Sequence, residues 1–456
     1  MTIAASLAQH LVRTTYNDLP ALAVDHAAMM ISSTIASAAM GFNIRSSRIV
    51  RELAREQGGA PEASIWFDAG ANIPAVNACR VNALTSDAAA SDDSDLRTIV
   101  HFGTQLTAAA LALGERNGAG GRDVLRAMVL GYEAGGRILD AVAPAHRDRG
   151  FHGAVIATFG AAAASACILK LDEQQVAQTL ALAAVSTAGL ATAADSSEAR
   201  EYFAGNAALM GINAALAAQK GYLVEESIFE AKKGFFEIYG GENIDAVTRD
   251  WGSEWDVITD MAIKLVPGGH PHHTTAEAAA IAAREGNVTP DQVESIIIAR
   301  PINKKLRTGP PGSPGPTRHP KNLVDVAHTP AYFAAAAVAD RDFSWVHASE
   351  RKFLDPVIHQ LIDKVKVGEP ITLDAEKYYQ GAQVTIKTKD GRSHTGTVYA
   401  PRGSGVRGIA WADVDSKYRT LVAMAALDAK KMEHSIRLIH EFRDVQNVSA
   451  LTTLLR

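Results

Sequence analysis

Three segments in the middle of the chain consist largely of alanine, glycine and other small residues. They are expected to form helices at 157–171, 174–194 and 206–221. Alanine and glycine let helix backbones approach each other closely, which suits the centre of a helical protein. The seven-residue repeat of a coiled coil is absent. These segments therefore predict a buried core of closely packed helices.

The first 260 residues elsewhere repeat their apolar positions every three or four residues, which is typical of amphipathic helices. This spacing predicts helices at 7–16, 22–40, 47–57, 74–90, 104–116 and 123–142. The composition changes after Pro267. Asp390-Gly391 between two alternating runs is a strong hairpin signal. The second part is thus expected to contain strands at 292–298, 382–388 and 393–399, helices at 329–339 and 355–365, and a helical tail at 410–456.

This order predicts a mostly α protein with two domains. A large all-α domain comprises residues 1–265 and 405–456, and a smaller α/β domain, residues 266–404, is inserted between them. A chain of 456 residues is long for a single core, which supports the division. A Gly/Pro-rich loop at 308–320 is expected to contain no stable helix or strand.

Composition limits the classes of partner. Hydrophobic residues are 47% and charged residues 21%, as in soluble globular proteins. The net charge of −5 argues against nucleic acid or an anionic membrane as the main partner. Two cysteines exclude a disulfide framework and suit a reducing cytoplasm. The start of the chain has no apolar signal-peptide core, and no uninterrupted apolar run reaches membrane-spanning length.

The densest group of reactive side chains lies in AIKLVPGGHPHHTTAE, residues 262–277. Lys264 stands in an apolar run, and His270 follows a Pro-Gly-Gly break. Thr274 and Glu277 have the spacing of a capping box, so a helix is expected to begin there. A helix start beside lysine and imidazole groups favours an anion that also needs proton transfer.

A metal site is the alternative for this loop, because His272 and His273 come close behind His270. The neighbouring pair would point apart, and no helical pair of histidines four residues apart is present, so we predict no metal. The chain also lacks a G-x-G-x-x-G after a strand, a Walker A loop and a G-x-S-x-G. Nicotinamide, nucleotide and serine-hydrolase functions therefore lose their usual support.

Three further stretches carry ionisable groups among apolar neighbours. An acidic cluster at 91–95 precedes His101, and its alternative interpretation is a solvated loop with a capping aspartate. His152 comes just before a small-residue helix, where a structural role is the alternative. Arg200 lies among helices with few charges. It must therefore pair with Glu198 or Glu201, or await an anion.

The order of these motifs resembles that of the MmgE/PrpD family, which includes 2-methylcitrate dehydratase, cis-aconitate decarboxylase and iminodisuccinate epimerase. Residues 81–101 are similar to its N-x-x-x-x-H-x-x-D-x-D-D region, and GFHGAVIATFGAAAA to its histidine motif. REYFAGNAA is similar to its T-K-P-x-x-x-G-N-A-A motif, FEAKKGFFEIYGG to its glycine-phenylalanine motif, and IKLVPGGHPHH to its lysine-proline motif. VDVAHTPAYFAAAAVAD and QVTIKTKDGRSHTGTV resemble its lid domain.

The resemblance implies a helical domain with an α/β lid, usually as a homodimer, and an active site between the two domains. It implies catalytic roles for three residues: His101, His152 and Lys264. Arg200 matches an active-site lysine, Ser91 falls near the first aspartate of the acidic motif, and Asp93 matches a later one. We expect these three residues and His270 to bind substrate. Arginine keeps the positive charge of lysine but is a poor proton donor or acceptor.

The resemblance also implies the chemistry, because family members form or quench a carbanion beside a carboxylate. We expect a cofactor-independent lyase acting on a di- or tricarboxylic acid, with dehydration favoured over epimerisation and decarboxylation. Arg200 and Lys264 would neutralise the charge, His152 or Lys264 would take the α-proton, and His101 would protonate the leaving group or the opposite face. An inactive homologue that binds a carboxylate or a partner is the alternative from another class, and a metal-dependent hydrolase is a third.

Overall fold

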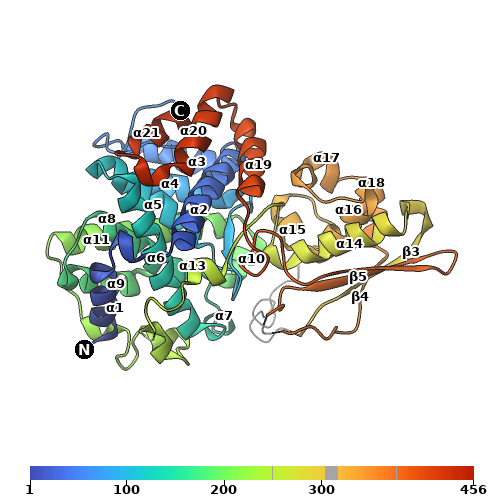
Figure 1. Cartoon of the computed structure of the whole chain (residues 1–456), viewed down its shortest axis with the longest axis horizontal. Helices are drawn as coiled ribbons and strands as arrows, with labels where there is room; N and C mark the ends of the chain where they lie inside the picture. Colours follow the sequence, from blue (N-terminus) through green and yellow to red (C-terminus); the bar gives the residue numbers. More distant parts are fainter. Residues whose placement is uncertain (249, 303–316, 376) are drawn as a thin grey trace.

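The computed structural model describes residues 1–248, 250–302, 317–375 and 377–456. It is mostly helical, with a small α/β part, which confirms the predicted fold class. Figure 1 shows a large helical body on one side and a smaller body with a sheet on the other. The C-terminal helices, in red, return to the large body. Most of the predicted loop at 308–320 lies outside the described residues.

The helical body contains α1 Ile3–Arg13, α2 Ala21–Gly41, α3 Arg45–Gln57, α4 Ala75–Ala88, α5 Phe102–Asn117, α6 Gly121–Val142, α7 Ala145–Asp148, α8 Ala154–Ile168, α9 Glu173–Ser186, α10 Ala191–Ser196, α11 Ala199–Gln219, α12 Phe235–Tyr239, α13 Asp256–Thr259, α19 Trp411–Val422, α20 Ala429–His440 and α21 Ser449–Thr452. Two strands, β1 Asp93–Asp95 and β2 Met261–Ile263, pair antiparallel within it. Its core includes residues from Ala4 to Ile263 and again from Val414 to Leu455.

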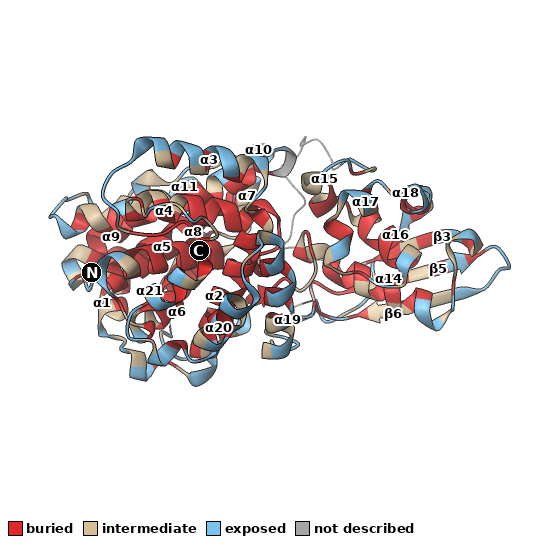
Figure 2. Ribbon diagram, turned by 90° about the horizontal axis from the view of Figure 1, so that it is seen from above, coloured by how far each residue is buried: buried red, intermediate tan, exposed pale blue. Residues whose placement is uncertain are grey.

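Helix α8 is the buried centre that the small residues predict. All its residues are buried, and it packs against α5, α6 and α11 (Figure 2). A Cβ on Gly211 would lie 2.6 Å from Cβ of Ala161 and 2.7 Å from the backbone N of Ala162. Such a separation leaves no room for a methyl group, so glycine is required where α11 crosses α8.

One helix among the described residues, α2, is long and apolar enough to cross a membrane by length and composition alone. Asp25 and His26 interrupt its apolar run, and 83% of its most apolar window is buried inside the protein. Core helices of soluble proteins pass the same test. Here α2 packs against α4 and α19.

The long helix predicted at 174–194 is wrong, because α9 ends at Ser186 and α10 begins at Ala191. Gly189 between them has φ 151°, which glycine adopts readily. Its carbonyl accepts from the backbone N–H of His152 at 3.1 Å, and the N–H of Ala191 donates to Gly150 at 2.9 Å. The break therefore supplies backbone partners for the loop that carries His152.

The smaller body contains α14 His273–Glu285, β3 Val293–Ala299, α15 Leu323–His328, α16 Pro330–Asp340, α17 Glu350–Phe353, α18 Pro356–Ile362, β4 Val365–Val367, β5 Ala382–Thr388 and β6 Ser393–Val398. The sheet order is β4-β3-β5-β6, parallel between β3 and β4 and antiparallel elsewhere. The predicted hairpin is confirmed as β5 and β6, with Gly391 at φ 85° in its turn. This body has its own core, from Ala276 to Val398. The predicted domain boundaries stay predictions.

Two local expectations in this body are wrong. The helix predicted at 355–365 ends at Ile362, and the chain enters β4, which pairs with β3. Helix α14 begins at His273, and the predicted capping box of Thr274 and Glu277 does not form at its start. The Thr274 hydroxyl instead donates to the carbonyl of Gln380 at 2.6 Å, and Glu277 pairs with Arg407 at 2.8 Å. Contacts with the later part of the chain therefore take the side chains that would cap the helix.

Short 3-10 turns complete the element order: η1 Tyr16–Asp18, η2 Glu226–Ile228, η3 Ile244–Val247, η4 His270–His272, η5 Pro290–Gln292, η6 Trp345–Ala348, η7 Ala423–Ala425, η8 Phe442–Asp444 and η9 Thr453–Leu455.

Candidate functional site

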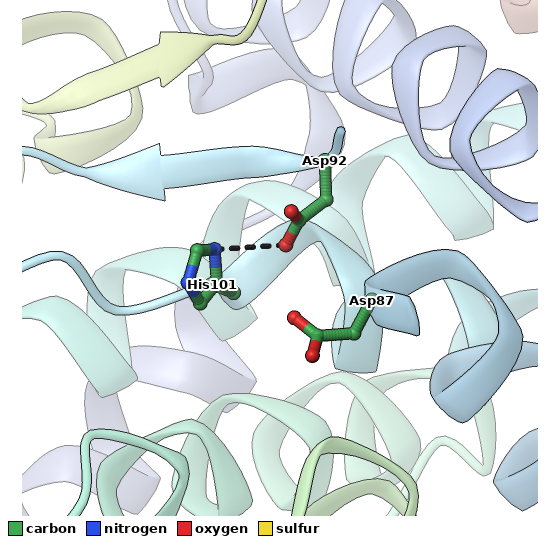
Figure 3. A group of neighbouring side chains, drawn as sticks. All are labelled: Asp87, Asp92 and His101. Carbon is green, nitrogen blue, oxygen red and sulfur yellow. Dashed lines mark ion pairs between the residues drawn. The ribbon is translucent and has the colours of Figure 1, made fainter. Parts of the chain in front are cut away.

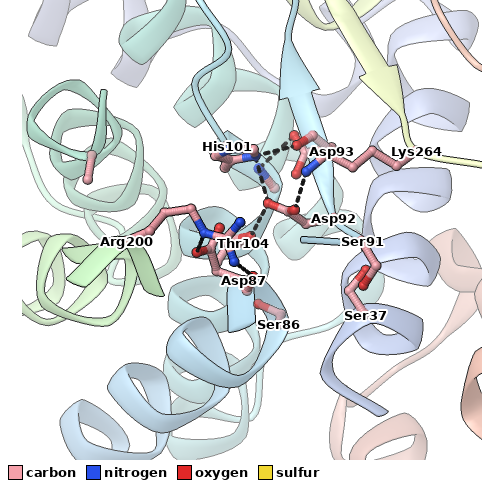
Figure 4. A network of polar contacts seen from close by, with 12 residues as sticks. Ser37, Ser86, Asp87, Ser91, Asp92, Asp93, His101, Thr104, Arg200 and Lys264 are labelled. Atoms are coloured by element: carbon pink, nitrogen blue, oxygen red, sulfur yellow. Dashed lines mark hydrogen bonds and ion pairs between the residues drawn. The ribbon is translucent and has the colours of Figure 1, made fainter. Parts of the chain in front are cut away.

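The acidic cluster is buried, so the solvated-loop alternative is wrong: residues 91–95 have no exposed surface. The pairing of β1 with β2 places Asp93 opposite Ile263, and the next residue, Lys264, reaches Asp92. The backbone N–H of Lys264 donates to the Asp92 carbonyl at 3.1 Å, and its Nζ donates to Oδ1 of Asp92 at 2.7 Å. Two segments 172 residues apart thus meet in a buried ion pair (Figure 4).

His101, just before α5, shares the same carboxylate. Its Nδ1 lies 2.8 Å from Oδ2 of Asp92 and 2.7 Å from the carbonyl oxygen of Asp93. Both atoms are acceptors, so Nδ1 carries the proton and Nε2 is left for chemistry. Burial alone would lower the pKa of His101, but the charge of Asp92 outweighs it and raises the pKa above 6.5.

The two aspartates differ in charge state. Burial would raise the pKa of Asp92, but His101 and Lys264 outweigh it and hold the pKa well below the usual value. Burial, followed by the charge of Asp92, raises the pKa of Asp93 to about 6. Oδ2 of Asp93 accepts from the N–H of Gly103 at 3.0 Å, whereas its Oδ1 is buried without a partner among the described residues. Asp92 is therefore the fixed negative charge of the cluster.

A small hollow lies beside His101. Its polar lining consists of Asp87, His101, Gln105, His152 and Arg200. The fold thus brings together three predicted site residues from different parts of the chain. In the described part of the chain, Lys264, Ser91, Asp93 and His270 are not among its lining residues. Lys264 and Asp93 adjoin it through Asp92 and His101.

His152 faces the hollow as a neutral imidazole. The backbone N–H of Ala154 donates to its Nδ1 at 3.2 Å, so the ring proton is on Nε2. Burial, followed by the charge of Arg147, holds the pKa of His152 well below 6.5. His152 is accordingly a neutral hydrogen-bond donor through Nε2, whereas His101 has a raised pKa and donates from Nδ1.

Arg200 pairs with a partner that the sequence interpretation did not consider. Its Nε lies 3.0 Å from Oδ2 of Asp87, and its Nη2 donates to the Asp87 carbonyl at 2.7 Å. The expected pairing with Glu198 or Glu201 is wrong. Glu198 instead contacts Arg45 at 3.4 Å, and Glu201 accepts from Ser46 at 2.9 Å. Position 87 falls where the family motif N-x-x-x-x-H has its histidine, five residues after Asn82, and this spacing is the signal that could have identified Asp87.

Ser91 and His270 lie near the site without touching the hollow. The Ser91 carbonyl accepts from Nζ of Lys417 at 2.5 Å, whereas its hydroxyl is buried without a partner among the described residues. His270 is fully buried, and within the same described residues neither ring nitrogen has a partner. Burial, followed by His273, holds the pKa of His270 well below 6.5.

Lys417 on α19 is a buried cation that the sequence analysis missed. Its Nζ also donates to the Ser33 hydroxyl at 2.6 Å, so it joins α2 to the start of the acidic cluster. Burial lowers the pKa of Lys417 to about 7. A single lysine in an amphipathic tail helix gives no sequence signal of burial, because such residues usually face solvent.

Asp87, Asp92 and His101 offer ligand atoms within 4.8 Å of one another (Figure 3). The set does not fit a divalent metal, because the carboxylates already accept from cations. Asp92 accepts from Lys264 and His101, and Asp87 accepts from Arg200. A metal there would face those positive charges directly.

Comparison with known proteins gives the family. The MmgE/PrpD N-terminal domain matches residues 5–246, and the MmgE/PrpD C-terminal domain matches residues 267–441. Cis-aconitate decarboxylase of Homo sapiens is 24% identical over 438 residues, covering 94% of this chain and 89% of that protein. The Mus musculus cis-aconitate decarboxylase is 27% identical over 361 residues (77% and 72%). A cis-aconitate decarboxylase-like protein of Aspergillus oryzae is 25% identical over 384 residues (79% and 78%). The chain therefore belongs to the MmgE/PrpD family, as its motifs predict.

Proposed function

We propose that this protein is a cofactor-independent lyase that decarboxylates a di- or tricarboxylic acid through a carbanion beside a carboxylate. The observation that carries the proposal is the environment of His101. Its Nδ1–H is fixed by Asp92 and the Asp93 carbonyl, which leaves Nε2 at the hollow with a raised pKa. Such a group is suited to delivering a proton near neutral pH.

The number of side chains that can transfer a proton favours decarboxylation, whereas the sequence analysis favoured dehydration. Dehydration and epimerisation each need a base and an acid, whereas decarboxylation needs one proton delivered to carbon. Of the two histidines that line the hollow, His101 has a raised pKa and His152 is held neutral with its proton on Nε2. The names of the relatives point the same way.

Each residue of the site has a separate role in the proposed reaction. Arg200 orients a substrate carboxylate, and the Nε2–H of His152 stabilises developing charge on oxygen. The bond to the leaving carboxylate breaks, carbon dioxide departs, and the electron pair stays on the carbon skeleton beside the remaining carboxylate. The proton on Nε2 of His101 goes to that carbon, and His101 regains a proton from water. Lys264 acts behind Asp92 by keeping that carboxylate in place.

Proton NMR in D2O with cis-aconitate, citrate, 2-methylcitrate and iminodisuccinate tests the proposal, with bicarbonate measured in parallel. We expect loss of one substrate with release of carbon dioxide and one deuterium in the product. An alkene without carbon dioxide would establish a dehydratase, and α-deuteration without net loss an epimerase. If none of the compounds changes with the wild type, and the result is the same with the His101→Asn control, the inactive homologue would be favoured.

The assembly and location remain proposals. We propose a homodimer in the cytoplasm. We also propose that it has no nucleic-acid partner, which the net charge of −5 supports. Sedimentation velocity measures the dimer, and a single species of about 48.3 kDa, the mass of one chain, would contradict it.

A further inference from the structure

The cations around the hollow already pair with carboxylates of the protein itself. Arg200 pairs with Asp87, and Lys264 and His101 both contact Asp92. A hollow for several carboxylates needs unmatched positive charge, because each buried anion requires a partner. With His101 protonated, the pairs on this wall leave one positive charge unmatched, which suits one substrate carboxylate and not several. The wall is therefore poorly suited to a substrate that presents only carboxylates.

Asp87 is the side chain that changes the balance. It stands at the end of α4, and its side chain is 1% exposed. Oδ2 accepts from Nε of Arg200, and no hydrogen bond to Oδ1 is found within the described residues. A carboxylate oxygen of Asp87 lies within 4.8 Å of ligand atoms of Asp92 and His101 (Figure 3). Asp87 thus brings a second negative charge to the hollow, and its Oδ1 is an acceptor that takes no hydrogen bond from the described residues.

A buried carboxylate oxygen is stabilised by a hydrogen-bond donor and repels another anion. We propose that Asp87 is a specificity-determining residue, which selects a substrate that carries a hydroxyl or ammonium donor next to the carboxylate bound by Arg200. This inference rests on the proposed function for the identity of the site. Cis-aconitate has no such group, so the substrate differs from the compound in the relatives' names.

Citrate and propane-1,2,3-tricarboxylate test the hydroxyl, because they differ only in that group. Aspartate and succinate test the ammonium in the same way. Isothermal titration calorimetry with the full-length protein measures binding without requiring turnover. A hydrogen bond to a charged group contributes about 1.5–3 kcal/mol, so we expect the donor-bearing member of at least one pair to bind more than tenfold tighter.

In Asp87→Asn the preference is expected to fall below threefold, with tighter binding of the compound that lacks the donor. Asp415→Asn is the matched control, because Asp415 forms an exposed pair with His440 at 3.0 Å. If Asp87→Asn does not fold, Asp87→Glu retains the charge and is expected to retain the preference. Equal affinity within both pairs in the wild type, a preference unchanged in Asp87→Asn, or no binding of any of the four compounds overturns the inference.

The two proposals fail separately. Selective binding without turnover of any panel member rejects the lyase and leaves the role of Asp87 in place. Turnover without a donor preference rejects the role of Asp87 alone.

Discussion

Nδ1 of His101 lies 2.8 Å from Oδ2 of Asp92, a fully buried carboxylate. The other oxygen of Asp92 holds Lys264 at 2.7 Å. A single negative charge therefore sets both the protonation of His101 and the position of the buried lysine. Substitutions at this aspartate separate the contributions of the two contacts.

Asp92→Asn is expected to lower kcat/KM by about 10²–10⁴, because the raised pKa of His101 depends on the charge. It also leaves Lys264 buried without an anion, which costs about 3–5 kcal/mol of stability, measurable by urea unfolding. Asp92→Asn/Lys264→Met removes both charges and should recover most of the stability but none of the activity. Recovery of activity in the double variant would contradict the role of Asp92.

The pH dependence of kcat/KM reports the acid form of His101. The pKa of His101 is raised above 6.5 by Asp92 against the effect of burial. A reaction that needs the protonated imidazole runs at low pH and slows as pH rises through that pKa. A stopped assay for carbon dioxide from pH 5.5 to 9 measures this fall of kcat/KM with rising pH. A rate that rises over this interval would instead identify His101 as a base.

His152 acts as a neutral hydrogen-bond donor, so its substitution should change the rate without shifting the pH at which kcat/KM falls. His152→Gln places an amide N–H near the position of Nε2 and is expected to retain about tenfold more activity than His152→Ala. Circular dichroism verifies that both variants fold. A shift of this pH in His152→Gln would show that His152 titrates during the reaction.

The sequence predicts those structural features that depend on residues close to one another in the chain. The small residues of α8, the spacing of the long helices and the Asp390-Gly391 turn each contain their own signal, and the structure confirms them. Thr274 shows the limit of local signals. Its hydroxyl could cap a helix, but the carbonyl of Gln380, 106 residues later, takes it.

The site depends on contacts that no local pattern encodes. Strand β1 has three residues and no period, but its pairing with β2 determines which carboxylate Lys264 meets. The expected partners of Arg200 were adjacent in sequence, whereas Asp87 is 113 residues away. Lys417 on α19 reaches Ser91 across 326 residues. The family motifs predicted His101, His152, Arg200 and Lys264 as site residues, whereas their ion-pair partners follow only from the fold.

Close packing of α8 and α11 predicts a steep difference between two Gly→Ala substitutions. A Cβ on Gly211 would meet backbone at 2.7 Å, whereas the nearest atom to a Cβ on Gly160 is at 3.3 Å. Gly211→Ala is expected to destabilise by about 1–3 kcal/mol. Gly160→Ala gains about 1 kcal/mol of helix propensity against a milder contact and should be nearly neutral. Urea midpoints compare the two, and equal midpoints would contradict the packing argument.

Lys417 should make stability depend on pH in a way that its removal abolishes. Burial lowers the pKa of Lys417 to about 7 in the folded protein, against about 10.4 for an unfolded lysine. Between these values the unfolded chain holds a proton that the folded chain lacks, so stability rises with pH. Relative to Lys417→Met, the wild type is expected to gain stability from pH 7 to 9.5.

The difference between the two urea unfolding curves isolates this residue, because the other titrating groups are shared. Lys430→Met, on the exposed side of α20, is the matched control and should track the wild type at each pH. Below pH 7 both forms of the chain hold the proton, so the difference between wild type and Lys417→Met should be flat there. A difference that stays flat above pH 7 would mean that the folded protein keeps Lys417 charged, and its contacts with Ser33 and Ser91 would then be those of an ammonium.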